Sequence, residues 1–166
     1  MVIFLSPGIS FLYEYQVAYR QQDEASSAVY SAIYTAIPAF ADDAKPYLLL
    51  ITDLDADSEL ALHPQDYNFP RIFAMHYDIQ EFRADAVLYN IDASLTSQRI
   101  QLTDEGIISP LRTDEVIAYD RVVIAQYDSQ TGQATILDTL PDDVLATGNF
   151  NGQPAMPIVT HHDLLE

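Results

Sequence analysis

Hydrophobic positions recur with helical spacing in residues 25–41, ASSAVYSAIYTAIPAFA, a stretch that carries no charged side chain. Wound as a helix, it has a stripe of alanines beside a stripe of β-branched residues. The first stripe is Ala25, Ala28, Ala32 and Ala36, and the second is Val29, Ile33 and Ile37. A helix that is apolar around most of its circumference is usually buried, and Pro38 cannot continue it. The pattern predicts one main buried helix over about residues 24–37, with its alanine stripe close to a sheet.

Two other segments have the patterns of strands. Residues 46–52, PYLLLIT, form a short continuous apolar run, which is typical of a central strand buried on both faces. In residues 9–20, aromatic and aliphatic residues alternate with polar ones, and this period of two predicts a strand. A helix with Phe11, Tyr15 and Tyr19 on one face is the competing interpretation.

The rest of the chain is rich in short strand-like segments. Further strands are predicted at residues 71–79, 84–91, 98–102, 116–119, 121–127 and 134–138. Residues 128–132 read as a hairpin loop with Gly132 in a left-handed or bulge position. Loops are predicted at residues 53–70 and 103–114, and a short helical turn at residues 140–146. This order predicts an α+β fold, in which the main helix packs on a largely antiparallel, meander-type sheet.

The length of 166 residues favours one domain. We expect a single α+β domain over residues 1–143, followed by an extended C-terminal segment, residues 144–166, that packs on this domain or on a partner. The apolar stretch at residues 25–41 is shorter than the roughly 20 apolar residues of a membrane span. Residues 1–15 lack the basic start and small-residue cleavage site of a signal peptide, so we expect a cytoplasmic protein.

Charge is the strongest feature of the composition. The chain has 25 acidic and seven basic residues, a net charge of −18. Such a surface repels nucleic acids and anionic membranes, and it favours a basic protein partner, which it would meet rapidly. Solubility in a host with acidic proteins explains the same charge equally well. The carboxylates that we expect to bind a partner lie in predicted loops or at the ends of elements. They are Asp53, Asp55, Asp57, Glu59, Asp104, Glu105, Asp114 and Glu115.

The loop after the central strand carries the most catalytic-looking residues, because the carboxylates of Asp53, Asp55 and Asp57 could hold a divalent cation. The stretch LLLITDLDADS resembles the strand-Asp-x-Asp start of haloacid-dehalogenase-type phosphatases. However, Asp57 stands where that family expects Thr or Val, and no lysine follows Lys45. The spacing of an EF-hand loop, the HExxH motif and glycine-rich phosphate loops are all missing. We therefore predict no catalytic residues, no metal site and no cofactor.

These observations favour a non-catalytic acidic binding protein that inhibits or masks a basic, nucleic-acid-handling partner. Toxin-immunity proteins and phage anti-defence proteins have this physical profile. By itself, such an inhibitor is expected to be a monomer or a homodimer. One alternative is a structural or assembly component of a virion or secretion apparatus, whose uncharged residues 144–162 would pair with a neighbour. A second alternative is a metal-dependent enzyme that uses the loop at residues 53–57.

Overall fold

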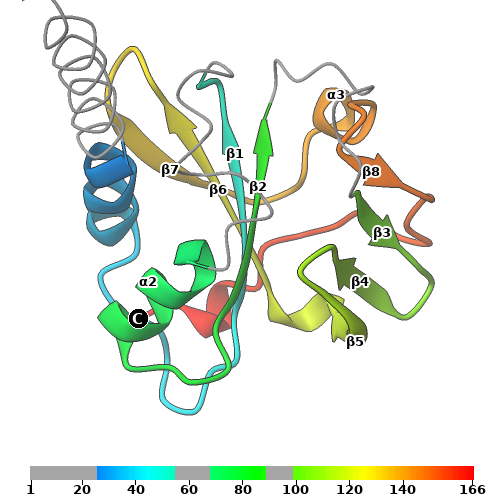
Figure 1. The fold of residues 1–166 in the computed structure, drawn as a ribbon, viewed down its shortest axis with the longest axis horizontal. Coiled ribbons are helices and arrows are strands. Elements are labelled where there is room, and N and C mark those ends of the chain that lie inside the picture. The colour runs from blue at the N-terminus through cyan, green and yellow to red at the C-terminus, as the bar shows by residue number, and fades with distance from the viewer. Residues whose placement is uncertain (1–25, 55–67, 89–98) are drawn as a thin grey trace, which may run out of the picture.

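The computed structural model describes residues 26–54, 68–88 and 99–166, and these form three layers. Helices cover one face of a four-stranded sheet, and a second four-stranded sheet covers the other face (Figure 1). The first helix spans residues 26–36 within the described part. The elements after it are β1 (Tyr47–Thr52), α2 (Asn68–Tyr77), β2 (Arg83–Leu88), β3 (Ile100–Leu102), β4 (Gly106–Ser109), β5 (Arg112–Ala118), η2 (Tyr119–Arg121), β6 (Val122–Asp128), β7 (Gln133–Leu137), α3 (Asp142–Leu145), β8 (Phe150–Asn151) and η3 (His162–Leu164). An α+β class is thus confirmed.

Strand β1 is the predicted central strand, and all six of its residues are buried. The first sheet has the order β2-β1-β6-β7, in which β1 runs parallel to both neighbours and β6 runs antiparallel to β7. Parallel strands are buried on both faces, and their sequences are therefore continuously apolar. This accounts for the run YLLLIT.

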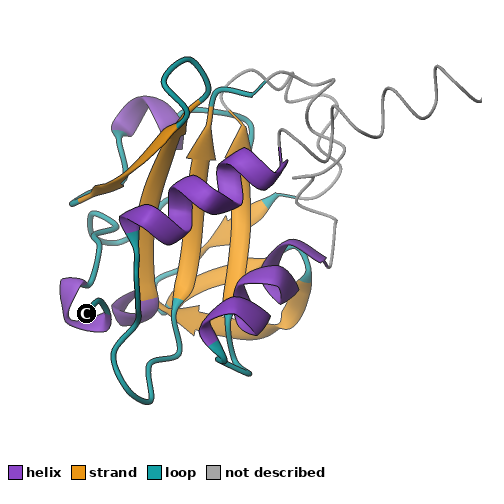
Figure 2. Cartoon of the chain, turned by 90° about the vertical axis from the view of Figure 1, so that its left-hand side faces the viewer, coloured by secondary structure: helices purple, strands orange, loops and turns teal. Residues whose placement is uncertain are grey.

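Side chains that alternate along β1 enter two different cores. Leu48 and Leu50 pack with the helices, whereas Leu49 and Ile51 pack with the second sheet. Figure 2 shows the 26–36 helix and α2 lying across the face of the first sheet. The layers on the two sides of β1 are therefore held by one strand.

Residues 71–79, predicted as a strand, belong instead to helix α2 and the turn after it. Phe69, Phe73 and Tyr77 are spaced four residues apart, so one helical face carries all three rings. Phe73 contacts Tyr30 at a centroid distance of 5.4 Å, and Tyr77 donates a hydrogen bond of 2.8 Å to the Ile37 carbonyl. Aromatic residues favour strands in general, but here packing at the helical period decides the structure.

The 26–36 helix is confirmed, but its predicted orientation is wrong. Val29 and Ile33 are fully buried in the core, while Ala28 is exposed and Ala32 and Ala36 are only partly buried. Burying branched side chains removes more apolar area from water than burying methyl groups. The β-branched stripe therefore faces the sheet. The helix is also not the single main one, because α2 covers the same face.

The predicted single meander is replaced by two mixed sheets. The second sheet has the order β5-β4-β3-β8, with β3 and β8 parallel and the other pairs antiparallel. Its inner face, which includes Ile107 and Ile117, packs against the side of β1 that the helices leave open. The sequence-based prediction placed β4 inside a loop, since a strand of four residues between Gly106 and Pro110 gives little periodicity.

The last residues of the chain pack on the domain. Ile158 is buried between the sheets, and Thr160 accepts a hydrogen bond from the Ile124 amide while its hydroxyl donates to the Leu137 carbonyl. Leu165 forms a bridge with Phe40. The β6–β7 hairpin is formed as predicted, and Gly132 has a φ of 66° in its turn. The predicted strand at residues 9–20 lies outside the described residues.

The orientation of the 26–36 helix can be tested with two substitutions on opposite faces. Ile33→Ala should lower the free energy of unfolding by about 2–5 kcal/mol, because it leaves a cavity in the core. Ala28→Leu should change it by less than about 0.5 kcal/mol, because the site is exposed. Urea unfolding followed by circular dichroism measures both. A strong loss of stability in Ala28→Leu would instead place the alanine stripe against the sheet.

Candidate functional site

The acidic residues predicted to bind a partner are distributed over different parts of the structure. Asp55, Asp57 and Glu59 lie outside the described residues. Asp53 follows β1, and its carboxylate accepts hydrogen bonds from the Ser129 amide at 2.8 Å and the Ser129 hydroxyl at 3.0 Å. Asp53 therefore fastens the end of β1 to the β6–β7 hairpin, and both of its oxygens already have a partner.

Glu115 lies between the two sheets. Its carboxylate pairs with Arg83 Nε at 3.0 Å and with Arg121 Nη1 at 3.3 Å, and its side chain is 30% exposed. These contacts join β5 of the second sheet to β2 and η2. Glu115 thus has an internal role, unlike its neighbour Asp114, which is exposed.

Asp104 and Glu105 are exposed in the turn between β3 and β4. The Thr103 hydroxyl accepts hydrogen bonds from the amides of Glu105 and Gly106, which fixes this turn. A side chain at Gly106 would collide with the backbone of Ile117, so the two strands approach closely here.

Helix η2 lies next to this turn, because the Tyr119 hydroxyl donates a hydrogen bond of 2.8 Å to the Thr103 carbonyl. Burial raises the pKa of Tyr119, and the negative charge of Asp104 raises it further. The arrangement brings the exposed Asp120 of η2 to the same end of the second sheet. Sequence reasoning missed Asp120 because it stands alone, not in an acidic doublet.

These acids border the outer face of the second sheet, the face turned away from β1. The registers place Asn151, Gln101 and Ile108 in a row across β8, β3 and β4. Along β5, Asp114, Val116 and Ala118 are exposed and alternate with the inward-facing Glu115 and Ile117. Val116 is 47% exposed. In Figure 1 this sheet forms the right-hand side of the molecule, opposite the 26–36 helix and α2, with the short helix α3 at its upper end.

We name this surface by its two parts. The outer sheet face consists of Gln101, Ile108, Val116, Ala118 and Asn151. The acidic rim consists of Asp104, Glu105, Asp114 and Asp120. Three of the predicted partner-binding residues, Asp104, Glu105 and Asp114, are therefore part of one surface, whereas Asp53 and Glu115 are held by contacts within the chain.

A buried carboxyl group lies in the interior of the protein, on strand β2. Asp85 on β2 is fully buried, and the Tyr47 hydroxyl donates to its Oδ2 at 2.8 Å, while Oδ1 has no hydrogen-bond partner among the described residues. Burial raises the pKa of Asp85 to about 7, and the hydroxyls of Tyr47 and Ser109 offset part of this effect. The same burial raises the pKa of Tyr47 well above its usual value. The sequence gives little sign of this, since aspartate in a strand usually faces solvent.

The histidines near the C-terminus form separate contacts. His162 Nε2 lies 2.9 Å from Asp138 Oδ1, and His161 Nδ1 lies 3.7 Å from Asp163 Oδ1. Within the described part of the chain, no group of three or more His, Asp or Glu side chains is arranged to hold a metal ion. Its helices are also too short or too polar to cross a membrane.

Comparison of the chain with protein-family models, with curated proteins and with solved structures finds no match in any of the three. The geometry and charge of the chain itself are therefore the basis for a proposed function.

The buried carboxyl gives a prediction for the pH dependence of stability. The folded pKa of about 7 lies above the ordinary value of about 3.9, so the native state holds a proton that the unfolded state releases. The protonated carboxyl makes its full contribution to the free energy of unfolding below about pH 4, and this contribution is lost as the pH rises to about 7. Asp85→Asn cannot ionise, and its stability relative to the wild type should increase by up to about 4 kcal/mol over this range.

Urea unfolding of both proteins at several pH values measures this difference. Asp42→Asn is the matched control, because Asp42 is exposed in a turn. If the difference in free energy of unfolding between the wild type and Asp85→Asn stays constant with pH, Asp85 does not change its charge on unfolding in this range.

Proposed function

We propose that this chain is a non-catalytic acidic binding protein that contacts a basic protein partner through the outer sheet face and the acidic rim. One observation carries the proposal: an uncovered row of uncharged side chains is bordered by exposed carboxylates. Among the described residues, Lys45 pairs with Glu81 at 2.9 Å, and Arg83 and Arg121 pair with Glu115. Neither glutamate belongs to the rim. The rim charges therefore remain for a partner.

This arrangement has the general anatomy of a protein interface. The centre of an interface is poor in charge and its border is polar, as with Ile108 and Val116 inside the acidic rim. Contact with the centre would remove apolar area from water, and the rim would select a partner of opposite charge. The total charge of −18 would accelerate the encounter, with an effect that salt weakens.

The partner class that suits this surface best is a nucleic-acid-handling protein. Such proteins carry lysine and arginine to neutralise phosphates, and the rim carboxylates would occupy the positions of phosphate groups. The chain would then inhibit or mask its partner. The charge and shape of this surface suit toxin-immunity and phage anti-defence roles equally.

The other two functions have less support. An assembly role depended on a free C-terminal segment, but Ile158 and Thr160 pack against the sheets. An enzyme role depended on Asp53, Asp55 and Asp57 after β1. The Asp53 carboxylate bonds to Ser129, and Asp55 and Asp57 lie outside the described residues. We therefore prefer the binding function.

Neutralising the acidic rim should abolish partner capture. The rim variant combines Asp104→Asn, Glu105→Gln, Asp114→Asn and Asp120→Asn. The control variant makes the same change in charge elsewhere, with Asp42→Asn, Asp43→Asn, Asp142→Asn and Asp143→Asn. Tagged proteins are incubated with an extract of the source cells at low and high salt, and bound proteins are quantified by mass spectrometry.

We expect the wild type and the control variant to retain the same basic protein at low salt, and the rim variant to lose it by about tenfold or more. Retention should also fall at high salt. Equal retention by the rim variant would exclude this surface, and capture of an acidic protein or of further copies of the chain would contradict the proposed partner class.

A further inference from the structure

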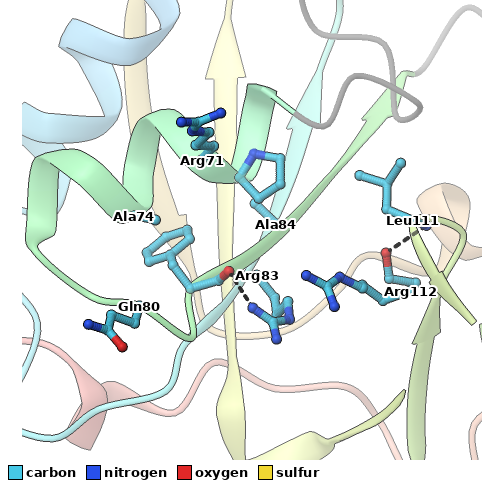
Figure 3. Close-up of a pocket in the computed structure, with 10 residues that line it drawn as sticks. Arg71, Ala74, Gln80, Arg83, Ala84, Leu111 and Arg112 are labelled. Carbon is cyan, nitrogen blue, oxygen red and sulfur yellow. Dashed lines mark hydrogen bonds between the residues drawn. The ribbon is translucent and has the colours of Figure 1, made fainter. Parts of the chain in front are cut away.

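A cavity of about 260 Å³ lies between α2, the start of β2 and the turn from β4 to β5 (Figure 3). It is separate from the outer sheet face, because it opens beside the edge strand of the first sheet. Arg71, Arg83 and Arg112 line it, and none of the acidic residues that the structure describes does. The chain has only seven basic residues against 25 acidic ones, so the three arginines that line this cavity are a large share of its basic residues.

Arg83 is fixed in place at this cavity. Its Nε bonds to Glu115 at 3.0 Å, its Nη1 donates to the Phe82 carbonyl at 3.1 Å, and its side chain is only 19% exposed. Glu115 is shared with Arg121, so one carboxylate faces two guanidinium groups. Glu81 adds a second carboxylate near these arginines, but it is paired with the Lys45 ammonium group, so the positive charge at this junction is only partly neutralised.

Arg112 adds a second guanidinium group. In Figure 3 it extends across the cavity toward Arg83, whereas the guanidinium group of Arg71 points away and only its stem borders the cavity. Among the described residues, neither Arg112 nor Arg71 forms an ion pair or hydrogen bond. Two like charges directed toward each other repel, and an anion between them would convert this repulsion into attraction.

The remaining walls are mostly apolar. Phe82, Ala84 and Leu111 line the cavity, and the Ser109 hydroxyl accepts a hydrogen bond from the Leu111 amide at its border. Small-molecule sites usually combine an apolar lining with a few converging polar groups. The volume of about 260 Å³ suits a small molecule.

We propose that this cavity binds a small organic anion, with a carboxylate or phosphate head between Arg83 and Arg112 and an apolar body against Phe82 and Leu111. Guanidinium groups present planar pairs of donors that match both kinds of oxyanion. The site is independent of the proposed protein interface, since it uses different residues and attracts the opposite charge.

Titration calorimetry with the full chain tests the site. The probes are phenyl phosphate and benzoate, and benzyl alcohol is the neutral analogue. Arg112→Gln removes one of the two facing guanidinium groups, and Arg99→Gln removes an exposed arginine that does not line the cavity. Thermal unfolding verifies that both variants fold. Amide NMR shifts locate the bound probe.

We expect the wild type to bind at least one charged probe and not benzyl alcohol, with amide shifts at Ala84, Ser109 and Leu111. Arg112→Gln should weaken binding by about tenfold or more, and Arg99→Gln should leave it within about twofold. A preference for one probe would identify the head group as carboxylate or phosphate. The proposal is wrong if neither charged probe binds up to about 10 mM, if both variants weaken binding equally, or if the shifts lie elsewhere.

Discussion

The burial of β1 on both faces is the constraint on which the rest of the structure depends. Its backbone N–H and C=O groups pair with those of β2 and β6, and all six of its side chains are excluded from water. A strand with Leu48 and Leu50 on one side and Leu49 and Ile51 on the other needs an apolar layer on each side. The helices supply one and the second sheet supplies the other, so both surfaces proposed for binding are carried by layers that β1 holds together.

Local patterns in the sequence predicted the elements whose character is set within a few residues. The run at residues 47–52 and the stripe of Val29, Ile33 and Ile37 are of this kind. Helix α2 was mistaken for a strand because its aromatic residues fit both periods, and the choice depends on the rings of Tyr30 and Phe82 that pack against Phe73. Parallel pairing of β1 with β2 and β6 depends on contacts between distant residues, which no short pattern specifies.

The same limit applies to the candidate site. The sequence was enough to select Asp104, Glu105 and Asp114 as exposed candidates for partner binding, because acidic pairs at the ends of elements are usually solvated. Asp114 and Glu115 are equivalent in sequence, and only the contact of Glu115 with Arg83 and Arg121 separates their roles. The buried Asp85 and the arginine-lined cavity depend on residues from separate elements, so their positions were not accessible to sequence reasoning.

Strand β5 explains how neighbouring charges come to serve different surfaces. Its pairing with β4 is irregular between Ile107 and Ser109, and such irregularity redirects side chains that would otherwise alternate strictly. Arg112 lines the cavity, Asp114 is exposed at the outer sheet face, and Glu115 reaches Arg83 of the first sheet. Because the chain has so few basic residues, each one has a large effect on the electrostatic potential around it. Arg83 and Arg121 hold the sheets together through Glu115, and Arg112 is left to provide positive charge at a single cavity on an otherwise acidic protein.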